Sequence, residues 1–148
     1  MEQNSEKTER HVKQVIVVDK SKQMNVGKIV AQACHASLGA LLKMFRTESS
    51  GLTTRYQVTF ERNSILDRWL NGIFTKICLA AKDESEMMSV YEKVVEYNKT
   101  HDNEIPVVLI EDSGLTCFHG VKTKTCVGIG PFWTDIIDEF TGNLKLFR

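Results

Sequence analysis

The sequence lacks the features that send a chain into a membrane or out of the cell. Residues 1–10 are polar and charged, without the apolar segment of a secretory signal, and no apolar run approaches the roughly 18 residues that span a bilayer. Basic and acidic residues both number 19, so the formal net charge is zero and no global basic field indicates nucleic-acid binding. The sequence therefore predicts a cytoplasmic location, and any nucleic-acid site must be a local patch.

Paired cysteines and the common catalytic motifs are also missing. The four cysteines form no CxxC pair, and their apolar or strand-like surroundings predict buried free thiols. Cys117 and His119 stand two positions apart, but no matching pair of metal ligands occurs elsewhere, so no metal site is predicted. The GxSxG, HExxH, GxGxxG and P-loop motifs are absent, which removes the hydrolase, metalloprotease and nucleotide-binding patterns that they mark.

What is present is one domain with alternating strands and helices. We expect a flexible polar tail at residues 1–11 and a single domain at residues 12–148. Apolar runs predict strands at residues 12–18, 75–81, 106–110 and 123–129, the last of them ended by Gly130-Pro131. Helical spacing predicts helices at residues 27–45, at 65–70 with Asn63 as cap, at 84–98 with the capping-box pair Asp83 and Glu86, and at 134–140 with Thr134 as cap. Residues 46–62 are polar and mixed, and we interpret them as a loop.

This order of elements predicts an α/β fold. Helical segments separate the first three strands, so parallel neighbours with right-handed crossovers are the default. Only a loop joins the third and fourth strands, which leaves them either antiparallel or apart in the sheet, so a mixed sheet is expected. Ligands of open α/β sheets bind at the carboxyl ends of parallel strands. The loops at residues 19–28 and 112–122 are therefore expected to border any site.

A lysine at the start of the first helix is the most informative local feature. Lys28 lies in the first turn, where a cation opposes the helix dipole at a cost of a few tenths to about 1 kcal/mol. Gln32 and His35 follow at i+4 and i+7 and extend one polar face. If the first and third strands run the same way, Lys28 and Asp112 lie at one edge, and a carboxylate or an anionic substrate offsets the cost of the lysine charge.

Each of these residues also has an ordinary structural interpretation. Asp112 before Ser113-Gly114 suits a turn, Lys28 suits a solvated first turn, and His35 suits a core histidine. A site is favoured by the side chains that converge on the same edge: the hydroxyls of Thr116, Thr123 and Thr125, the imidazole of His119, and the four lysines Lys20, Lys22, Lys122 and Lys124. A local basic edge of this kind can neutralise a few phosphates.

Four segments in order, GKIVAQACHAS, LIEDSGLT, TCVGIGP and TGNLKL, resemble the type 2 peptidyl-tRNA hydrolase family, the archaeal and eukaryotic kind. The resemblance covers about Lys13 to Phe147. It implies a three-layer α/β/α sandwich around a four-stranded mixed sheet, often as a homodimer. It also implies hydrolysis of the ester between the peptide and the 3′ ribose of peptidyl-tRNA, which recycles tRNA from aborted translation. No metal or organic cofactor is expected.

The resemblance also implies site residues. The family's lysine, aspartate and two threonines match Lys28, Asp112, Thr116 and Thr125, and its glutamine and histidine on the same helix match Gln32 and His35 as substrate-binding residues. Phosphate contacts are expected from the four lysines of the basic edge, Lys20, Lys22, Lys122 and Lys124.

The chain departs from the family at several positions. Asp19 and Glu111 stand where arginines are usual, and Phe74 stands where a glutamine is usual. Ser21 replaces an aspartate. The loop before the fourth strand is one residue longer, so Thr123 competes with Thr125 for the family position, and residues 46–62 exceed the usual link. The lost positive charge puts tRNA affinity in question more than chemistry.

The chemistry implied is stabilisation of a developing oxyanion by Lys28 and helix amides, with a water held or deprotonated by Asp112 and positioned by the two threonine hydroxyls. The identity of the general base stays open. A non-catalytic RNA-binding or protein-interaction module on the same fold is the second hypothesis. The retained Lys28 and Asp112 favour the enzyme, whereas the lost arginine and glutamine favour the module.

Overall fold

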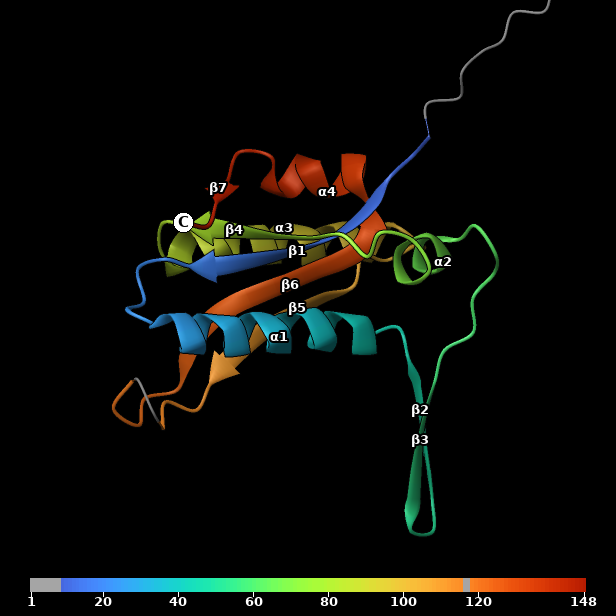
Figure 1. Cartoon of the computed structure of the whole chain (residues 1–148), viewed down its shortest axis with the longest axis horizontal. Coiled ribbons are helices and arrows are strands. Elements are labelled where there is room, and N and C mark those ends of the chain that lie inside the picture. The colour runs from blue at the N-terminus through green and yellow to red at the C-terminus, as the bar shows by residue number, and fades with distance from the viewer. Residues whose placement is uncertain (1–8, 116–117) are drawn as a thin grey trace, which may run out of the picture.

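The computed structural model describes residues 9–115 and 118–148. This part of the chain forms a five-stranded mixed sheet, four helices and a separate two-stranded hairpin (Figure 1). In chain order the elements are β1 Val12–Asp19, α1 Val26–Leu42, β2 Arg46–Ser50, β3 Thr53–Gln57, α2 Ile65–Leu70, β4 Lys76–Ala81, α3 Glu84–Thr100, β5 Val107–Asp112, β6 Thr123–Trp133, α4 Thr134–Thr141 and β7 Lys145–Leu146.

The sheet has the order β5-β6-β1-β4-β7, and its strand directions confirm the predicted mixed α/β sheet. β1 pairs parallel with β4 and antiparallel with β6, and β5 also pairs antiparallel with β6. β1 and β5 therefore run in the same direction with β6 between them. The loops that follow β1 and β5 leave the sheet at one edge, beside the start of α1 (Figure 1).

The central strand β1 separates two apolar clusters because its side chains alternate between the faces of the sheet. Val15 and Val17 are fully buried on the face covered by α3 and α4, whereas Ile16 and Val18 pack with Ala36 of α1 on the other face. α1 approaches β6 closely because Gly128 has no side chain: a Cβ at Gly128 would lie 2.3 Å from the carbonyl oxygen of Ala36. This contact fixes the helix that carries the candidate site.

The predicted number of four strands is wrong by one. Residues Lys145–Leu146 form β7, an edge strand that pairs antiparallel with β4, and the backbone N–H of Phe147 donates to the Cys78 carbonyl at 3.0 Å. β7 has only two residues, both exposed, which is too short for the alternation of apolar and polar side chains that predicts a strand.

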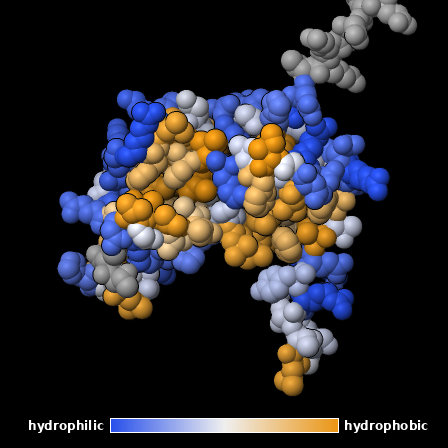
Figure 2. Space-filling model, in the orientation of Figure 1, coloured by the Kyte–Doolittle hydropathy of each residue, from blue (hydrophilic) through white to orange (hydrophobic). Residues whose placement is uncertain are grey.

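The predicted loop at residues 46–62 contains a β-hairpin. β2 and β3 pair from Arg46 with Gln57 to Ser50 with Thr53, and Gly51 takes a positive φ of 58° in the turn. Every residue of both strands is exposed, and the hairpin projects from the body beyond the end of α1 (Figure 1). Its surface is largely polar, with an apolar tip where Leu52 is fully exposed (Figure 2). Because no face is buried, the hairpin lacks the period-2 pattern that marks a strand.

Two predicted helix caps are wrong by one residue. Ser64, not Asn63, caps α2 and accepts the Asp67 N–H at 3.3 Å. Trp133 occupies the cap position of α4 without a side-chain cap hydrogen bond, and Thr134 is the first helical residue, whose N–H donates to the His11 carbonyl at 2.9 Å.

The cap of α3 is as predicted, with one difference in the capping box. The Asp83 carboxylate accepts the Glu86 N–H at 2.9 Å. The Glu86 carboxylate in return accepts the N–H of Lys82 at 2.6 Å, one residue before the cap.

The fourth predicted strand also runs further than expected. β6 continues past Gly130-Pro131 to Trp133, because Gly130 still donates to the Pro106 carbonyl at 2.7 Å and pairing with β1 resumes at Phe132. At the same end of β1, Arg10 of the predicted tail binds Asp135 of α4 through two hydrogen bonds of 3.1 Å.

The cysteines follow the predicted burial only in part. Cys126 is buried, and desolvation raises the pKa of its thiol to about 12. Cys78 is half-buried with a raised pKa, also through desolvation, whereas Cys34 is exposed on α1, so its predicted burial is wrong. Cys117 lies outside the described residues. None of the helices in the described ranges has the length and apolarity to cross a membrane.

Candidate active site

The start of α1 and the end of β5 bring a lysine and an aspartate together. Asn25 caps α1, and its side chain accepts the Lys28 N–H at 2.9 Å. The ammonium of Lys28 lies 2.6 Å from Oδ1 of Asp112, and the two side chains are only 14% and 10% exposed. No acidic residue lies in the first turn of α1. The carboxylate that balances the first-turn lysine therefore comes from β5, as expected from the strand directions.

The Asp112 carboxylate is held by donors on both oxygens. Oδ1 accepts from Lys28 and, at 3.3 Å, from the Gln32 side chain, while Oδ2 accepts the Gly114 N–H at 2.9 Å. The hydrogen bond from Lys28 is the main reason that the pKa of Asp112 lies below its ordinary value; Gly114 and Gln32 act in the same direction, and desolvation opposes them. Asp112 is therefore ionised at neutral pH.

The backbone at position 114 accommodates only glycine. Its φ is +79°, and a Cβ would lie 2.3 Å from the Val121 carbonyl oxygen. The Gly114 carbonyl also accepts the Gly120 N–H at 2.8 Å, which ties together the two ends of the loop after β5. The turn predicted at Asp112 is thus real, and it places a backbone donor on the carboxylate.

Gln32 links Asp112 to a threonine of β6. Gln32 is 3% exposed; its amide nitrogen faces Asp112, and its amide oxygen accepts the Thr125 hydroxyl at 2.5 Å. Because the Thr125 hydroxyl donates to the oxygen, the amide must present its N–H group to the carboxylate. Hydrogen bonds therefore run in one direction from Thr125 through Gln32 to Asp112.

A β-bulge turns Thr125 toward α1. Ile110 pairs with Cys126 and Glu111 pairs with Lys124, so Thr125 is the extra residue between two pairs. An undisturbed alternation would place Thr125 on the face of Val127, which packs with α3 and α4. The length of the loop before this strand indicates the extra residue, but the sequence carries no signal for the bulge that accommodates it.

Thr123 occupies a different position. It pairs with Asp112 in the strand register, but its hydroxyl donates to the Val121 carbonyl at 2.8 Å. Of the two competing threonines, Thr125 is the one that binds Gln32. Thr116, the other predicted threonine, lies outside the described residues.

An aromatic ring that the sequence did not single out lies near the lysine. The Phe118 ring centroid is 5.9 Å from the ammonium of Lys28, within the range of a cation–π contact. His35 is exposed on α1, one turn beyond Gln32, so it is not a core histidine. Among the described residues, no three His, Cys, Asp or Glu side chains gather as a metal site would need.

Two of the four lysines expected to bind phosphate are paired with carboxylates. The ammonium of Lys22 lies 3.0 Å from Glu84 and 3.9 Å from buried Asp19, and that of Lys122 lies 3.1 Å from Glu111. Lys20 and Lys124 form no ion pair with any residue in the described ranges. Asp19 and Glu111, which stand where arginines are usual in the family, thus partly neutralise Lys22 and Lys122.

Asp19 itself orders the loop after β1. Its Oδ1 accepts the Ser21 N–H at 2.9 Å and the Ser21 hydroxyl at 2.6 Å, and its Oδ2 makes no hydrogen bond within the described residues. Phe74, the third departure, precedes β4 and so lies at the opposite edge of the sheet from Lys28. Its ring packs 4.3 Å from the ring of Trp69. Of the positions where the family's arginines and glutamine are lost, only Asp19 and Glu111 lie near the candidate site.

Comparison with known proteins gives one family over almost the whole chain. The family model described as peptidyl-tRNA hydrolase PTH2 matches residues 12–147. A peptidyl-tRNA hydrolase of Methanopyrus kandleri is 35% identical over 136 residues, 92% of this chain and 98% of its own length. Those of Sulfolobus acidocaldarius and Sulfurisphaera tokodaii are 32% and 34% identical, over 91% and 90% of this chain and 99% and 97% of theirs.

Proposed function

Because the chain belongs to the peptidyl-tRNA hydrolase PTH2 family, we propose that it hydrolyses the ester bond between the peptide and the 3′ ribose of peptidyl-tRNA. The observation that supports this most directly is the 2.6 Å contact between Lys28 and Asp112, two charged and largely buried groups at the carboxyl edge of the sheet. An ion pair with so little exposure at a helix start has a clear use if the site must stabilise a developing negative charge.

Lys28 is proposed to stabilise the oxyanion. Attack of water on the ester carbonyl places negative charge on the carbonyl oxygen. The Lys28 ammonium carries a full positive charge, and the backbone amides at the start of α1 carry a partial one. The two lie close together, so their stabilisation of an oxyanion adds. The unfavourable position of Lys28 in the first turn then has a catalytic use, and the Asp112 carboxylate offsets its free-energy cost in the substrate-free protein.

Asp112 is proposed to hold Lys28 and to orient the attacking water. Its pKa is depressed, which makes the carboxylate a weaker base than an ordinary aspartate. The same donors that depress the pKa also fix the position of both carboxylate oxygens. Orientation of a water molecule therefore suits this carboxylate better than removal of its proton.

Gln32 and Thr125 are proposed as positioning residues. They act through Asp112, because the Gln32 amide links the Thr125 hydroxyl to the carboxylate. Thr116 is proposed to bind the attacking water and His35 to bind substrate; both roles rest on the family resemblance alone.

The competing hypothesis is a module that binds RNA without hydrolysing it. The lost arginines and glutamine favour it, but Phe74 lies at the opposite end of the strands, Asp19 pairs with Lys22, and Glu111 pairs with Lys122. These pairs weaken phosphate contacts and do not involve Lys28 or Asp112.

A turnover assay with purified protein and an N-acylated aminoacyl-tRNA separates the two hypotheses. Release of deacylated tRNA by the parent and its loss in Lys28→Ala supports the enzyme. Binding of tRNA by the parent without any release supports the module.

Three further properties implied by the sequence and the resemblance are proposed with the activity: one folded unit over residues 12–148 in a three-layer arrangement, a homodimer, and action in the cytoplasm. Exposed apolar side chains on α1, with Val30 at 56% and Leu38 at 57%, are compatible with a protein contact there. Sedimentation velocity of the parent and of Leu38→Glu tests the dimer.

A further inference from the structure

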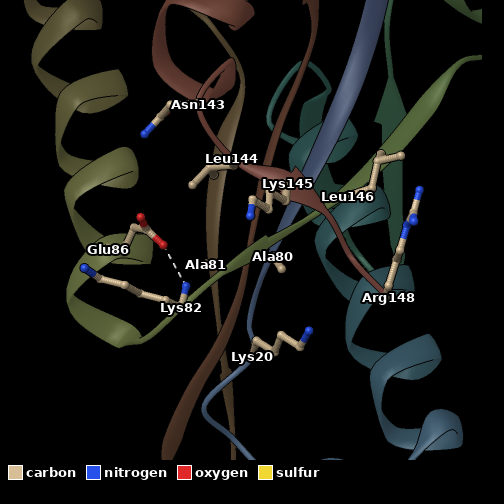
Figure 3. Close-up of a pocket in the computed structure, with 10 residues that line it drawn as sticks. All are labelled: Lys20, Ala80, Ala81, Lys82, Glu86, Asn143, Leu144, Lys145, Leu146 and Arg148. Carbon is tan, nitrogen blue, oxygen red and sulfur yellow. Dashed lines mark hydrogen bonds between the residues drawn. The ribbon is translucent and has the colours of Figure 1, made fainter.

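A groove lined by cations lies beside β4 and β7, apart from the Lys28–Asp112 pair, and includes only Lys20 of the four lysines expected to bind phosphate (Figure 3). Its volume is about 680 Å³. Four of its lining side chains are basic and come from four places in the sequence: Lys20 after β1, Lys82 after β4, Lys145 in β7 and Arg148 after it. Glu86 is the one acidic residue among the lining residues.

The four basic side chains of this groove have no ion-pair partner within the described part of the chain. None of the four basic side chains forms an ion pair there, whereas Lys22, Lys28 and Lys122 each pair with a carboxylate. One Glu86 oxygen already accepts the backbone N–H of Lys82 at 2.6 Å, the contact drawn in Figure 3. In a chain of zero net charge, four unpaired cations around one cavity form a local field that attracts a polyanion.

Two basic residues of the groove lie at the same end of the strands as the candidate active site, although β7 and β5 are the opposite edge strands of the sheet. Lys20 and Lys82 directly follow β1 and β4, which are parallel neighbours, so they lie at the same carboxyl edge as Asp112. The Lys20 N–H donates to the Ala81 carbonyl at 2.9 Å, which fixes Lys20 beside the end of β4. Lys28 follows eight positions later, and eight residues of chain reach at most about 28 Å.

A short length of nucleic-acid duplex can span any distance up to this limit. A DNA double helix carries a phosphate charge for about every 1.7 Å of its axis, so one short duplex presents phosphates along its whole length. A duplex whose 3′ end enters the Lys28 site can therefore place phosphates on the groove.

We propose that this groove binds phosphates of the tRNA duplex next to the scissile ester. The proposal rests on the proposed function, which supplies tRNA as the ligand. It also explains how substrate is held when Lys22 and Lys122 are engaged with Glu84 and Glu111. The groove supplies unpaired cations in place of these two lysines.

The test compares two double variants that each remove one lysine and one arginine charge. Lys82→Gln with Arg148→Gln removes two of the groove's four basic charges, and Lys43→Gln with Arg62→Gln is the matched control. Lys43 and Arg62 are exposed, form no ion pair with a described residue, and lie beside the end of α1 and the start of α2, at the opposite edge of the sheet.

The first measurement is the affinity for deacylated tRNA as a function of KCl concentration, by fluorescence anisotropy. Each lost phosphate contact lowers the slope of log affinity against log salt by about 0.9, so the groove variant should lose about 1.8 in slope and the control should match the parent. A groove variant with the slope of the control overturns the proposal.

The second measurement separates the groove from the chemistry. With full-length peptidyl-tRNA, the groove variant should raise KM and keep kcat. With a peptidyl ester of the 3′-terminal nucleotides, which has no duplex, the groove variant should match the parent. A loss of equal size on the short ester contradicts the proposal. If the parent hydrolyses neither substrate but the tRNA-binding slopes still differ, the proposed function is wrong and the groove stands.

Discussion

Lys28 and Asp112 are 84 positions apart in the sequence, and their charged atoms lie 2.6 Å apart. Three separate features bring them together: the Asn25 cap that starts α1, the common direction of β1 and β5, and the Gly114 turn that donates to the carboxylate. Each feature acts on a different element. The pair is therefore a product of the whole fold, and a change at either residue tests the site without dismantling an element.

Replacing Asp112 by asparagine tests the carboxylate. Asp112→Asn is nearly isosteric, so the fold should persist, but the carboxylate that orients water and fixes Lys28 is lost. Turnover of peptidyl-tRNA should fall by about 10²–10⁴-fold, the usual scale for such assistance. Affinity for tRNA should stay equal or improve slightly, because a negative charge near phosphates is gone. Steady-state kinetics and a tRNA-binding titration measure the two effects.

The control for this variant is Asp102→Asn, which alters an exposed carboxylate in the loop before β5. It should leave turnover unchanged. Parent-like hydrolysis by Asp112→Asn would remove Asp112 from the catalytic assignment.

The lowered pKa of Asp112 predicts a particular pH dependence. A carboxyl group whose pKa is lower in the folded state stabilises the fold fully above its ordinary pKa, near 3.8, and this stabilisation is lost as the pH falls through the folded value. The stability difference between the parent and Asp112→Asn should therefore be constant from neutral pH down to about 5 and shrink below it. Urea unfolding at a series of pH values measures this difference. A difference that already shrinks near pH 6 contradicts a depressed pKa.

The parts of the site that follow from local pattern and strand direction could be predicted from sequence. The polar face of α1, with Lys28 and Gln32, follows from helical spacing, and its meeting with Asp112 follows from two strands of common direction. The positions of helices α1 to α4 also follow from helical spacing, because each helix buries one face of its side chains.

The parts that depend on backbone pairing could not be predicted. The bulge at Thr125 depends on the pairing register between β5 and β6. The side-chain pattern of one strand alone does not indicate that register. The hairpin β2–β3 and the short strand β7 bury no apolar face, so their residues resemble a loop. The pairing of Lys122 with Glu111 likewise depends on where the loop after β5 returns to the sheet.

The bulge gives a test that separates the two threonines of β6. Thr125→Val removes the hydroxyl that orients the Gln32 amide, so the amide is free to present its oxygen to Asp112. The loss of about one net hydrogen bond, 0.5–1.5 kcal/mol, should lower kcat by roughly threefold to tenfold. Thr123→Val is the matched change, and its hydroxyl donates only to the Val121 carbonyl among the described residues, so kcat should stay unchanged. If the two variants exchange these outcomes, Thr123 is the family threonine.

The ion pair between Lys122 and Glu111 predicts a gain of affinity by removal of a carboxylate. The pair lies at the surface, with side chains 75% and 33% exposed, and such a pair contributes about 0–1 kcal/mol, so Glu111→Gln should not destabilise the fold measurably. The variant releases Lys122 and removes a negative charge beside Asp112. Binding of deacylated tRNA should tighten by up to about fivefold at low salt, and the salt slope should steepen by about 0.9, one phosphate contact.

Glu96→Gln provides the control for this gain, because it breaks the exposed pair with Lys99 on α3 and changes the net charge equally. It should leave the salt slope unaltered. A Glu111→Gln variant whose slope matches that of Glu96→Gln shows that Lys122 does not reach a phosphate, and the predicted role of this lysine is then wrong. A steeper slope in Glu111→Gln alone shows that Glu111 restrains tRNA binding through Lys122, with the catalytic pair of Lys28 and Asp112 unchanged.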